Sequence, residues 1–208
     1  SMSKSKKNTI DPEEIIENYG ADAVRLFMLS DSPPEKDVQW TEQGIVACYK
    51  FIQKLWTLHE KIKDKLNTTE RSQQNSDEIS KFTNQLIDKI NINLEKFHNN
   101  VIVANFYETY NFLIKEIEKP INKKNLIENY TKILKLMCPI LPHFASECLE
   151  ELEYDNKLDW PITDKKVSTL ENYNIVVQIN GKKRNIINTN LNMDEKTLIN
   201  EIKNNSIT

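Results

Sequence analysis

The sequence predicts a mainly α-helical protein, in which an antiparallel helix bundle is followed by the start of a small α+β domain. Apolar residues recur every three or four positions through most of residues 41–153, which is the spacing of a helix buried along one face. The polar connections between these runs are short, so the helices can bury their apolar faces only against one another. Later in the chain, an alternating apolar run leads to Asn180-Gly181, a pair that is typical of a β-hairpin turn.

A loop and two short helices are predicted before the bundle. The first ten residues carry three lysines and no acid, and they show no apolar periodicity. Asp11 followed by Pro12 predicts a helix start, because the aspartate side chain can accept hydrogen bonds from free backbone N–H groups and proline fits the first turn. Gly20 is expected to end this helix, and residues 21–29 are expected to form the next one.

Five helices are predicted for the bundle. The first runs from Thr41 to about Leu66, which is roughly seven turns or about 39 Å. Its apolar stripe consists of Ile45, Cys48, Ile52, Leu55, His59, Ile62 and Leu66. The second and third helices are predicted from two more stripes with the same spacing: Ile79, Phe82, Leu86, Ile90, Leu94 and Phe97, then Val103, Tyr107, Tyr110, Ile114 and Ile117. The fourth helix should cover residues 123–137 and the fifth residues 142–152.

Composition excludes several classes of protein. The chain has 28 Lys and Arg against 31 Asp and Glu, and this net charge of −3 argues against a wholly basic nucleic-acid binder. Its 3 glycines are too far apart to form a dinucleotide-binding fingerprint or a Walker-type phosphate loop. No apolar run approaches the roughly 18 residues of a membrane span, no signal peptide is apparent, and the odd number of cysteines fits a reducing compartment. A soluble, cytoplasmic protein without a membrane partner is expected.

Two basic groups of side chains could carry a function, and each also has a simpler explanation. A stripe of lysines follows one face of the first long helix: Lys50, Lys54, Lys61 and Lys65. These lysines either keep the helix surface soluble or follow the phosphate backbone of a nucleic acid. The basic opening of the chain, from Met2 to Asn8, is either a flexible tail or a grip for a polyphosphate.

Cys138, His143, Glu147 and Cys148 invite a metal-site interpretation, because thiolates and imidazole are ligands of zinc. Their spacing places the side chains on different faces of a helix. A buried cysteine and a hydrogen-bonded histidine are therefore the preferred interpretation, and no metal site is predicted. His59 is interpreted as a hydrogen-bonded histidine at the boundary of the core.

The opening of the chain also resembles a known family. Met2-Ser3-Lys4-Ser5 is similar to the K-M-S-K-S signature of class I aminoacyl-tRNA synthetases, although Ser1 stands where the signature has its first lysine. The match continues through Asn8, Asp11, Pro12, Tyr19, Gly20, Ala21, Asp22, Arg25 and Leu26.

Three later stretches extend this resemblance over essentially the whole chain. Residues 32–40 are similar to the leucine-specific branch of the class. Residues 138–149 resemble a helix start in the tRNA-binding helical domain shared by leucyl, isoleucyl, valyl and methionyl enzymes, although Glu150 stands where that motif often ends in tryptophan. Trp160-Pro161 and residues 177–182 resemble the small C-terminal domain of bacterial-type leucyl enzymes.

The resemblance implies the C-terminal part of a leucine-tRNA ligase, which activates leucine with ATP and Mg²⁺ and transfers it to tRNA(Leu). Lys4 would be catalytic by stabilising charge on the phosphates, within an ATP-binding loop made of Met2, Ser3, Lys4 and Ser5. The domain with the H-I-G-H motif, through which leucine and ATP would bind, and the editing domain are not found in this sequence. The chain alone is therefore expected to be catalytically inactive, to hold no ATP or Mg²⁺, and to be a monomer.

The resemblance also implies a division into three parts. Residues 1–40 would hold the signature loop and short connecting helices at the end of the catalytic domain. Residues 41–165 would form a helical tRNA-binding domain of the anticodon-binding type, and residues 166–208 an incomplete α+β domain. The RNA contacts are expected at Lys50, Lys54, Lys61, Lys182, Lys183 and Arg184. The alternatives are another large class I synthetase, such as the isoleucyl, valyl or methionyl enzyme, and a non-catalytic helical adaptor for a protein partner.

Overall fold

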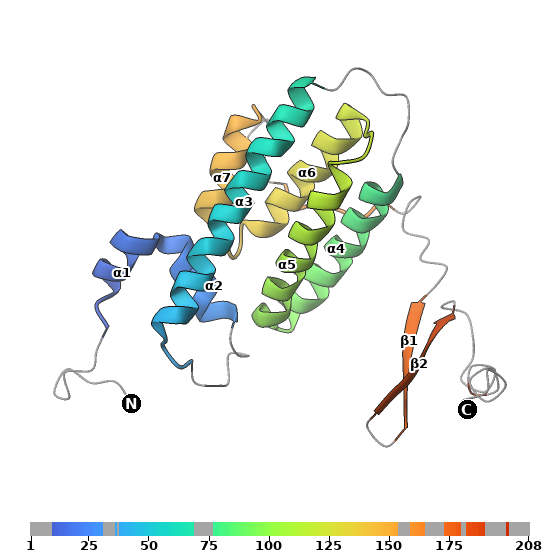
Figure 1. Cartoon of the computed structure of the whole chain (residues 1–208), viewed down its shortest axis with the longest axis horizontal. Helices are drawn as coiled ribbons and strands as arrows, with labels where there is room; N and C mark the ends of the chain where they lie inside the picture. The colour runs from blue at the N-terminus through green and yellow to red at the C-terminus, as the bar shows by residue number, and fades with distance from the viewer. Residues whose placement is uncertain are drawn as a thin grey trace. The chain divides into compact units, whose positions relative to one another are not determined.

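The computed structural model of this chain describes residues 10–30, 36, 38–68, 77–153, 159–164, 173–179, 182–189 and 199. The chain divides into two compact units, Ser1–Thr163 and Asp164–Thr208. The described residues are helical in the first unit and form a two-stranded sheet in the second (Figure 1). The predicted domain boundaries at residues 40 and 165 stay predictions.

Two short helices precede the bundle, as the sequence predicts. Helix α1 covers Pro12–Tyr19, and the Asp11 carboxylate accepts a hydrogen bond from the Glu13 N–H at 3.0 Å. Gly20 ends this helix with a φ of 83°, a left-handed conformation that costs glycine little because it has no Cβ. Helix α2 then covers Ala21–Ser30.

The long helix α3, Glu42–Thr68, has 27 residues and is therefore about 40 Å long. The Thr41 hydroxyl accepts a hydrogen bond from the Gly44 N–H at 3.1 Å and so caps its first turn. Helix α2 approaches this turn so closely that a Cβ at Gly44 would collide with the ring of Phe27. Glycine at this position therefore allows α2 to pack directly on α3.

Four further helices complete the bundle: α4 Asp77–Glu95, α5 Asn99–Glu116, α6 Lys123–Met137 and α7 Pro142–Glu151. The mainly helical fold class is confirmed. Figure 1 shows α5 between α3 and α4, and the core lies between the helices of the bundle. The largest side chains of this core that are fully buried include Leu26, Ile45, Ile62, Ile90, Phe106 and Ile133. No described helix has the length and apolar character that crossing a membrane requires.

The prediction that Phe97 belongs to the stripe of α4 is wrong. Helix α4 ends at Glu95, and Phe97 lies beyond it with 68% of its surface exposed and a φ of 54°. The N–H groups of Phe97 and His98 donate to the carbonyls of Leu94 and Asn93, which is the hydrogen-bond pattern of a helix that ends in a left-handed residue. The chain therefore reverses before Phe97 can reach the core.

The predicted stripe of α5 is displaced by about one residue. Val103 and Ile117 are buried, but Tyr107 is exposed, and the centre of the stripe is formed by Ile102, Phe106 and Leu113. Sequence periodicity cannot choose between these faces because both carry apolar side chains. Packing decides the outcome: the Tyr107 ring instead stacks on Phe51 of α3, with ring centroids 3.8 Å apart.

Helix α7 receives its N-terminal cap from another helix. Its N-cap residue, Leu141, has no side-chain acceptor, so the first N–H groups need a partner elsewhere. Asp22 of α2 supplies it: its carboxylate accepts hydrogen bonds from the Phe144 N–H at 2.8 Å and from His143 Nδ1 at 2.9 Å. Asp22 is itself buried. A negative charge at this position also stabilises the positive end of the α7 dipole.

Arg25 adds a second connection from α2 to the same turn. Its Nε donates to the carbonyl of Ile140 at 3.1 Å, and its Nη2 donates to the carbonyl of Pro139 at 2.7 Å. These carbonyls follow the end of α6 and have no partner within that helix. Asp22 and Arg25 together fasten the N-terminal helices to the turn between α6 and α7.

The second unit contains an antiparallel hairpin. Strand β1, Tyr173–Ile179, pairs with β2, Lys182–Thr189, and the Ile179–Lys182 pair closes the sheet next to Asn180-Gly181. The register shifts between Val177 and Gln178, so Arg184 lies opposite no residue of β1 and forms a β-bulge. The predicted helix at residues 194–203 lies outside the described residues except for Ile199, and the α+β domain stays a prediction.

Two isoleucines of α4 test the assignment of the core. Ile90 is fully buried, whereas 52% of the Ile92 surface is exposed. Ile90→Ala should lower the free energy of unfolding by about 2–5 kcal/mol, because it removes apolar contacts and leaves a cavity. Ile92→Ala, the matched control, should stay within about 0.5 kcal/mol of wild type. Urea denaturation followed by circular dichroism measures both, and equal losses would contradict the assigned face.

Substitution of Asp22 tests the cap of α7. Asp22→Ala leaves the Phe144 N–H buried without a partner, and it should lower the free energy of unfolding by about 1–3 kcal/mol. Asp22→Asn keeps an oxygen acceptor at the same place and should cost less. Denaturation of the two variants under identical conditions gives the comparison. A smaller loss for alanine than for asparagine would rule out the cap as the role of Asp22.

Candidate nucleic-acid interface

A row of exposed lysines lies along α3. We call Lys50, Lys54 and Lys61 the lysine face; all three side chains are exposed, and none of them has an ion pair with another described residue. Their spacing of four and seven residues brings them to one side of the helix. Lys65, the fourth lysine of the predicted stripe, is only partly exposed. The lysine face therefore presents free ammonium groups at intervals along a rigid element.

The acids of α3 are distributed unevenly around these lysines. Between Glu42 and Glu60 the helix has no Asp or Glu, so Lys50 and Lys54 lie in a stretch of purely positive charge. Lys61 lies beside Glu60 and near Asp64, where the charges are mixed. The N-terminal half of α3 is consequently the part of the lysine face that would attract phosphate most strongly.

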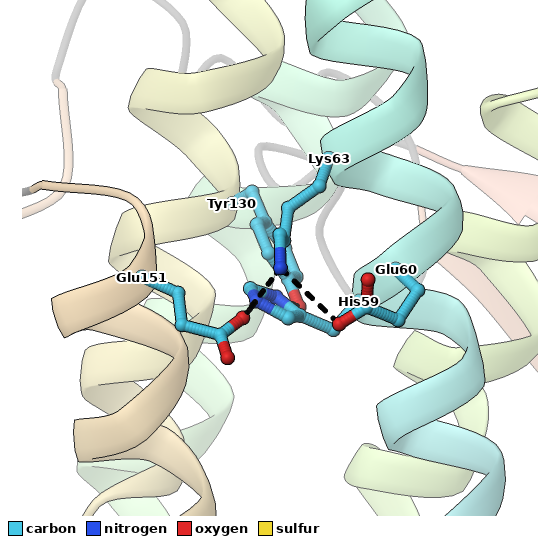
Figure 2. Close-up of polar contacts among 5 residues, drawn as sticks. All are labelled: His59, Glu60, Lys63, Tyr130 and Glu151. Carbon is cyan, nitrogen blue, oxygen red and sulfur yellow. Dashed lines mark hydrogen bonds and ion pairs between the residues drawn. The ribbon is translucent and has the colours of Figure 1, made fainter.

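A polar cluster behind this face connects α3 to α6 and α7 (Figure 2). His59 of α3 is fully buried, and its Nδ1 lies 3.0 Å from the hydroxyl of Tyr130 on α6. Its Nε2 lies 3.0 Å from Glu151 at the end of α7. The same carboxylate oxygen accepts a hydrogen bond from Lys63 at 2.7 Å, and Lys63 also pairs with Glu60. The cluster therefore joins three helices through one imidazole and one carboxylate.

The partners of His59 determine its protonation. Hydrogen bonding to Lys63 lowers the pKa of Glu151, so this carboxylate is ionised and acts only as an acceptor. Burial raises the pKa of Tyr130, so its hydroxyl keeps its proton and can donate. Neutral His59 with its proton on Nε2 satisfies both partners: Nε2–H donates to Glu151, and Nδ1 accepts from Tyr130. Burial lowers the pKa of His59, and this effect exceeds the opposing effect of Glu151.

A cleft opens on another side of α3, and we call it the α2–α3–α7 cleft. It has a volume of about 650 Å³, and its walls come from the junction of α1 and α2, from α3 and from α7. The side chains important for its chemistry are Tyr19, Tyr49, Gln53, Trp56, His143 and Glu147. Its volume is typical of sites that hold a small molecule or a short segment of chain.

The structure describes some of the predicted site residues but not others. Met2, Ser3, Lys4 and Ser5, the predicted ATP-binding loop, lie outside the described residues. Lys182, Lys183 and Arg184 lie in β2, and the Arg184 side chain is exposed. The described helices bring Lys50, Lys54 and Lys61 together on one face, whereas the three cationic residues of β2 belong to the separate second unit.

The two cysteines and the histidine that were considered as metal ligands are engaged or buried elsewhere. The Cys138 thiol lies 3.6 Å from the carbonyl of Leu134, and Cys148 is buried in the core. His143 bonds to Asp22, as described above. Across the described ranges, no three His, Cys, Asp or Glu side chains are grouped so that they could hold a metal ion.

Sequence reasoning missed the structural roles of two residues, His59 and Asp22. His59 was predicted to lie at the boundary of the core with a hydrogen bond, but it is fully buried and its partners come from α6 and α7. The role of Asp22 was not predicted either. One signal could have revealed it: a helix that starts with Leu141-Pro142 has no capping side chain of its own and therefore requires one from elsewhere.

Comparison with family models gives two matches. The model described as "Anticodon-binding domain of tRNA ligase" matches residues 76–199, which is more than half of the chain. The model described as "tRNA synthetases class I (I, L, M and V)" matches residues 1–41.

Curated relatives named leucine--tRNA ligase match most of the chain. The protein of Bartonella tribocorum (strain CIP 105476 / IBS 506) is 39% identical over 194 residues, covering 88% of this chain and 22% of the relative. That of Parvibaculum lavamentivorans (strain DS-1) is 36% identical, covering 95% of this chain and 24% of the relative. That of Wolbachia pipientis wMel is 36% identical, covering 95% and 23%. The chain therefore spans less than a quarter of the length of these relatives.

A solved structure has a similar fold. It comes from the crystal structure of the ternary complex of Agrobacterium radiobacter K84 agnB2 LeuRS-tRNA-LeuAMS. The match has a TM-score of 0.76 at 24% sequence identity, and it covers 97% of this chain and 27% of that chain. At this level of identity the likeness concerns the fold alone.

The buried position of His59 predicts a pH dependence of stability. Its pKa is lower in the folded chain than its ordinary value of 6.5, so below pH 6.5 the unfolded chain binds more protons. Its stabilising contribution is therefore complete above pH 6.5 and is lost as the pH falls through the folded-state pKa. Wild type should lose more stability than His59→Gln between pH 7 and pH 5, with a slope difference of at most about 1.4 kcal/mol per pH unit. Parallel slopes in urea denaturation would contradict the prediction.

Proposed function

Because this chain belongs to the family of anticodon-binding domains of tRNA ligases, we propose that it is the tRNA-holding part of a leucine-tRNA ligase. The relatives reported above are all named leucine--tRNA ligase, which favours the leucine branch over the isoleucine, valine and methionine branches. Membership of this family also argues against an unrelated helical adaptor.

The main observation in support of an RNA contact is that the lysines of the lysine face have no ion pairs with described residues. Lys50 and Lys54 are exposed, lack ion pairs with described residues, and lie in the part of α3 that has no acid. Charges held on a rigid helix can contact successive phosphates without a large loss of side-chain and backbone freedom. Phosphate contacts position an RNA but carry little sequence information, so the bundle would hold tRNA(Leu) without reading its sequence.

The ligase as a whole would activate leucine with ATP, in the presence of Mg²⁺, and then transfer leucine to tRNA(Leu). In this proposal Lys4 stabilises charge on the phosphates of ATP, together with Met2, Ser3 and Ser5. Leucine and ATP would bind mainly to regions of the longer relatives that this chain does not cover. We further propose that the ligase acts as a monomer in the cytoplasm.

A second candidate for RNA contact is the cationic group of β2. Lys182, Lys183 and Arg184 are consecutive, and the bulge at Arg184 interrupts the regular pairing of the strand. Bulges change the direction in which a side chain leaves a sheet and are common near functional sites. This group would add to the lysine face rather than replace it.

The salt dependence of tRNA binding tests the lysine face. Each phosphate contact releases counterions, so the double variant Lys50→Ala/Lys54→Ala should flatten the plot of log K against log salt by about one unit for each lost contact. Wild-type binding should be weak, sensitive to salt and only modestly selective for tRNA(Leu). Fluorescence titration of labelled tRNA(Leu) at several salt concentrations gives both slopes.

The control for this experiment removes the same charge elsewhere. Lys81 of α4 and Lys123 of α6 are also exposed, so Lys81→Ala/Lys123→Ala has the same net charge as the test variant. It should keep the wild-type slope. If both double variants change the slope equally, the attraction is a general effect of net charge. If neither changes it, the lysine face has only a solubilising role and the β2 group becomes the leading candidate.

A further inference from the structure

The α2–α3–α7 cleft is lined by acidic side chains, whereas the lysine face is basic. Among the residues that the structure describes, no lysine or arginine lines the cleft, whereas the carboxylates of Asp22 and Glu147 do. Of the four helices that border the cleft, α1 and α7 carry no lysine or arginine; their acids are Glu13, Glu14, Glu17, Glu147, Glu150 and Glu151. Arg25 of α2 and the lysines of α3 are not among the described residues that line it. A phosphate backbone would be repelled here, and a cation would be attracted.

The two carboxylates that line the cleft are not equally available to a ligand. Both oxygens of Asp22 are already engaged by the backbone and side chain at the start of α7. Glu147 lies one turn further along α7, is exposed, and has no ion pair with a described residue. It is therefore the carboxylate of the cleft that remains available to a cation.

Aromatic rings form much of the remaining wall. Tyr19 and Tyr49 meet edge to face with ring centroids 5.8 Å apart, and Trp56 meets Phe144 in the same way at 5.2 Å. Tyr19, Tyr49 and Trp56 are each partly exposed, so their rings remain accessible. Aromatic faces attract organic cations, and tryptophan and tyrosine attract them most strongly.

We propose that the α2–α3–α7 cleft binds an arginine side chain of a polypeptide segment, with Glu147 as its carboxylate partner and the rings of Tyr19, Tyr49 and Trp56 as its apolar surface. A guanidinium suits this combination better than an ammonium, because it is planar, weakly hydrated and able to stack on rings while it donates two hydrogen bonds to a carboxylate. The cleft volume of about 650 Å³ also accommodates the residues next to the arginine.

The cleft and the lysine face use different side chains of α3. Tyr49, Gln53 and Trp56 lie on the cleft side of α3, whereas Lys50, Lys54 and Lys61 lie on another side of the same helix. An RNA and a basic polypeptide segment would therefore contact different side chains of α3 and could bind at the same time.

Titration with a matched pair of peptides tests the proposal. The first is acetyl-Ala-Arg-Ala-amide, and the second carries citrulline, a neutral residue of nearly the same shape, in place of arginine. Calorimetry at low salt should show saturable binding of the arginine peptide and affinity about tenfold lower for the citrulline peptide. Equal affinities would overturn the proposal, since binding would not depend on the cation.

Two variants locate the site. Glu147→Gln should weaken binding of the arginine peptide by about three- to tenfold. Glu118→Gln removes an exposed acid from a separate groove between α3 and α5 and should leave the affinity unchanged. Equal effects of the two substitutions would overturn the proposal in favour of general attraction to an acidic surface.

Two competitors identify the occupant. If spermidine binds more tightly than the arginine peptide and is equally sensitive to Glu147→Gln, the site belongs to a polyamine and the proposed occupant is wrong. If labelled tRNA(Leu) is displaced by the arginine peptide from wild type but not from Glu147→Gln, the cleft contacts RNA, and the proposal is again wrong. Neither of these two outcomes would decide whether Lys50 and Lys54 contact RNA, because the salt dependence of tRNA binding tests that proposal separately.

Discussion

Asp22 and Arg25 hold together parts of the chain that are more than a hundred residues apart, and the arrangement of the first unit depends on this connection. Helix α7 begins without a capping side chain of its own, and the carbonyls at the end of α6 also need partners. A carboxylate and a guanidinium from one helix satisfy both needs. Because both groups are charged, these hydrogen bonds are stronger than bonds between neutral groups, and the burial of Asp22 strengthens its bonds further. The short helices before the bundle thereby become part of it.

Helix α7 is held at both ends by charged groups. Asp22 caps its start, and near its other end Glu151 accepts hydrogen bonds from His59 and Lys63 of α3. The contacts of Glu151 connect α7 to α3, and these two helices provide two of the walls of the cleft. The polar cluster around His59 therefore supports the site without contacting a ligand itself.

Although the net charge of the chain is only −3, basic and acidic side chains are concentrated on different sides of α3. Lys50 and Lys54 are exposed in a stretch of α3 without acids, whereas Asp22 and Glu147 are the acids among the described residues that line the cleft. Local potentials, rather than the sum over the chain, decide which partner approaches which face. A nearly neutral chain can therefore offer one surface suited to phosphate and another suited to an organic cation.

The sequence alone determined where several helices begin and end, because those signals are local: Asp11 caps the helix that follows it, and Gly20 ends that helix. It also predicted the lysine face, since helical spacing follows from sequence distance. Only the tertiary structure decided which apolar face of α5 is buried, where Phe97 lies, and which distant groups bond to His59 and Asp22. These outcomes depend on contacts between segments far apart in the chain, and local periodicity contains no information about which of two similar faces meets a neighbour.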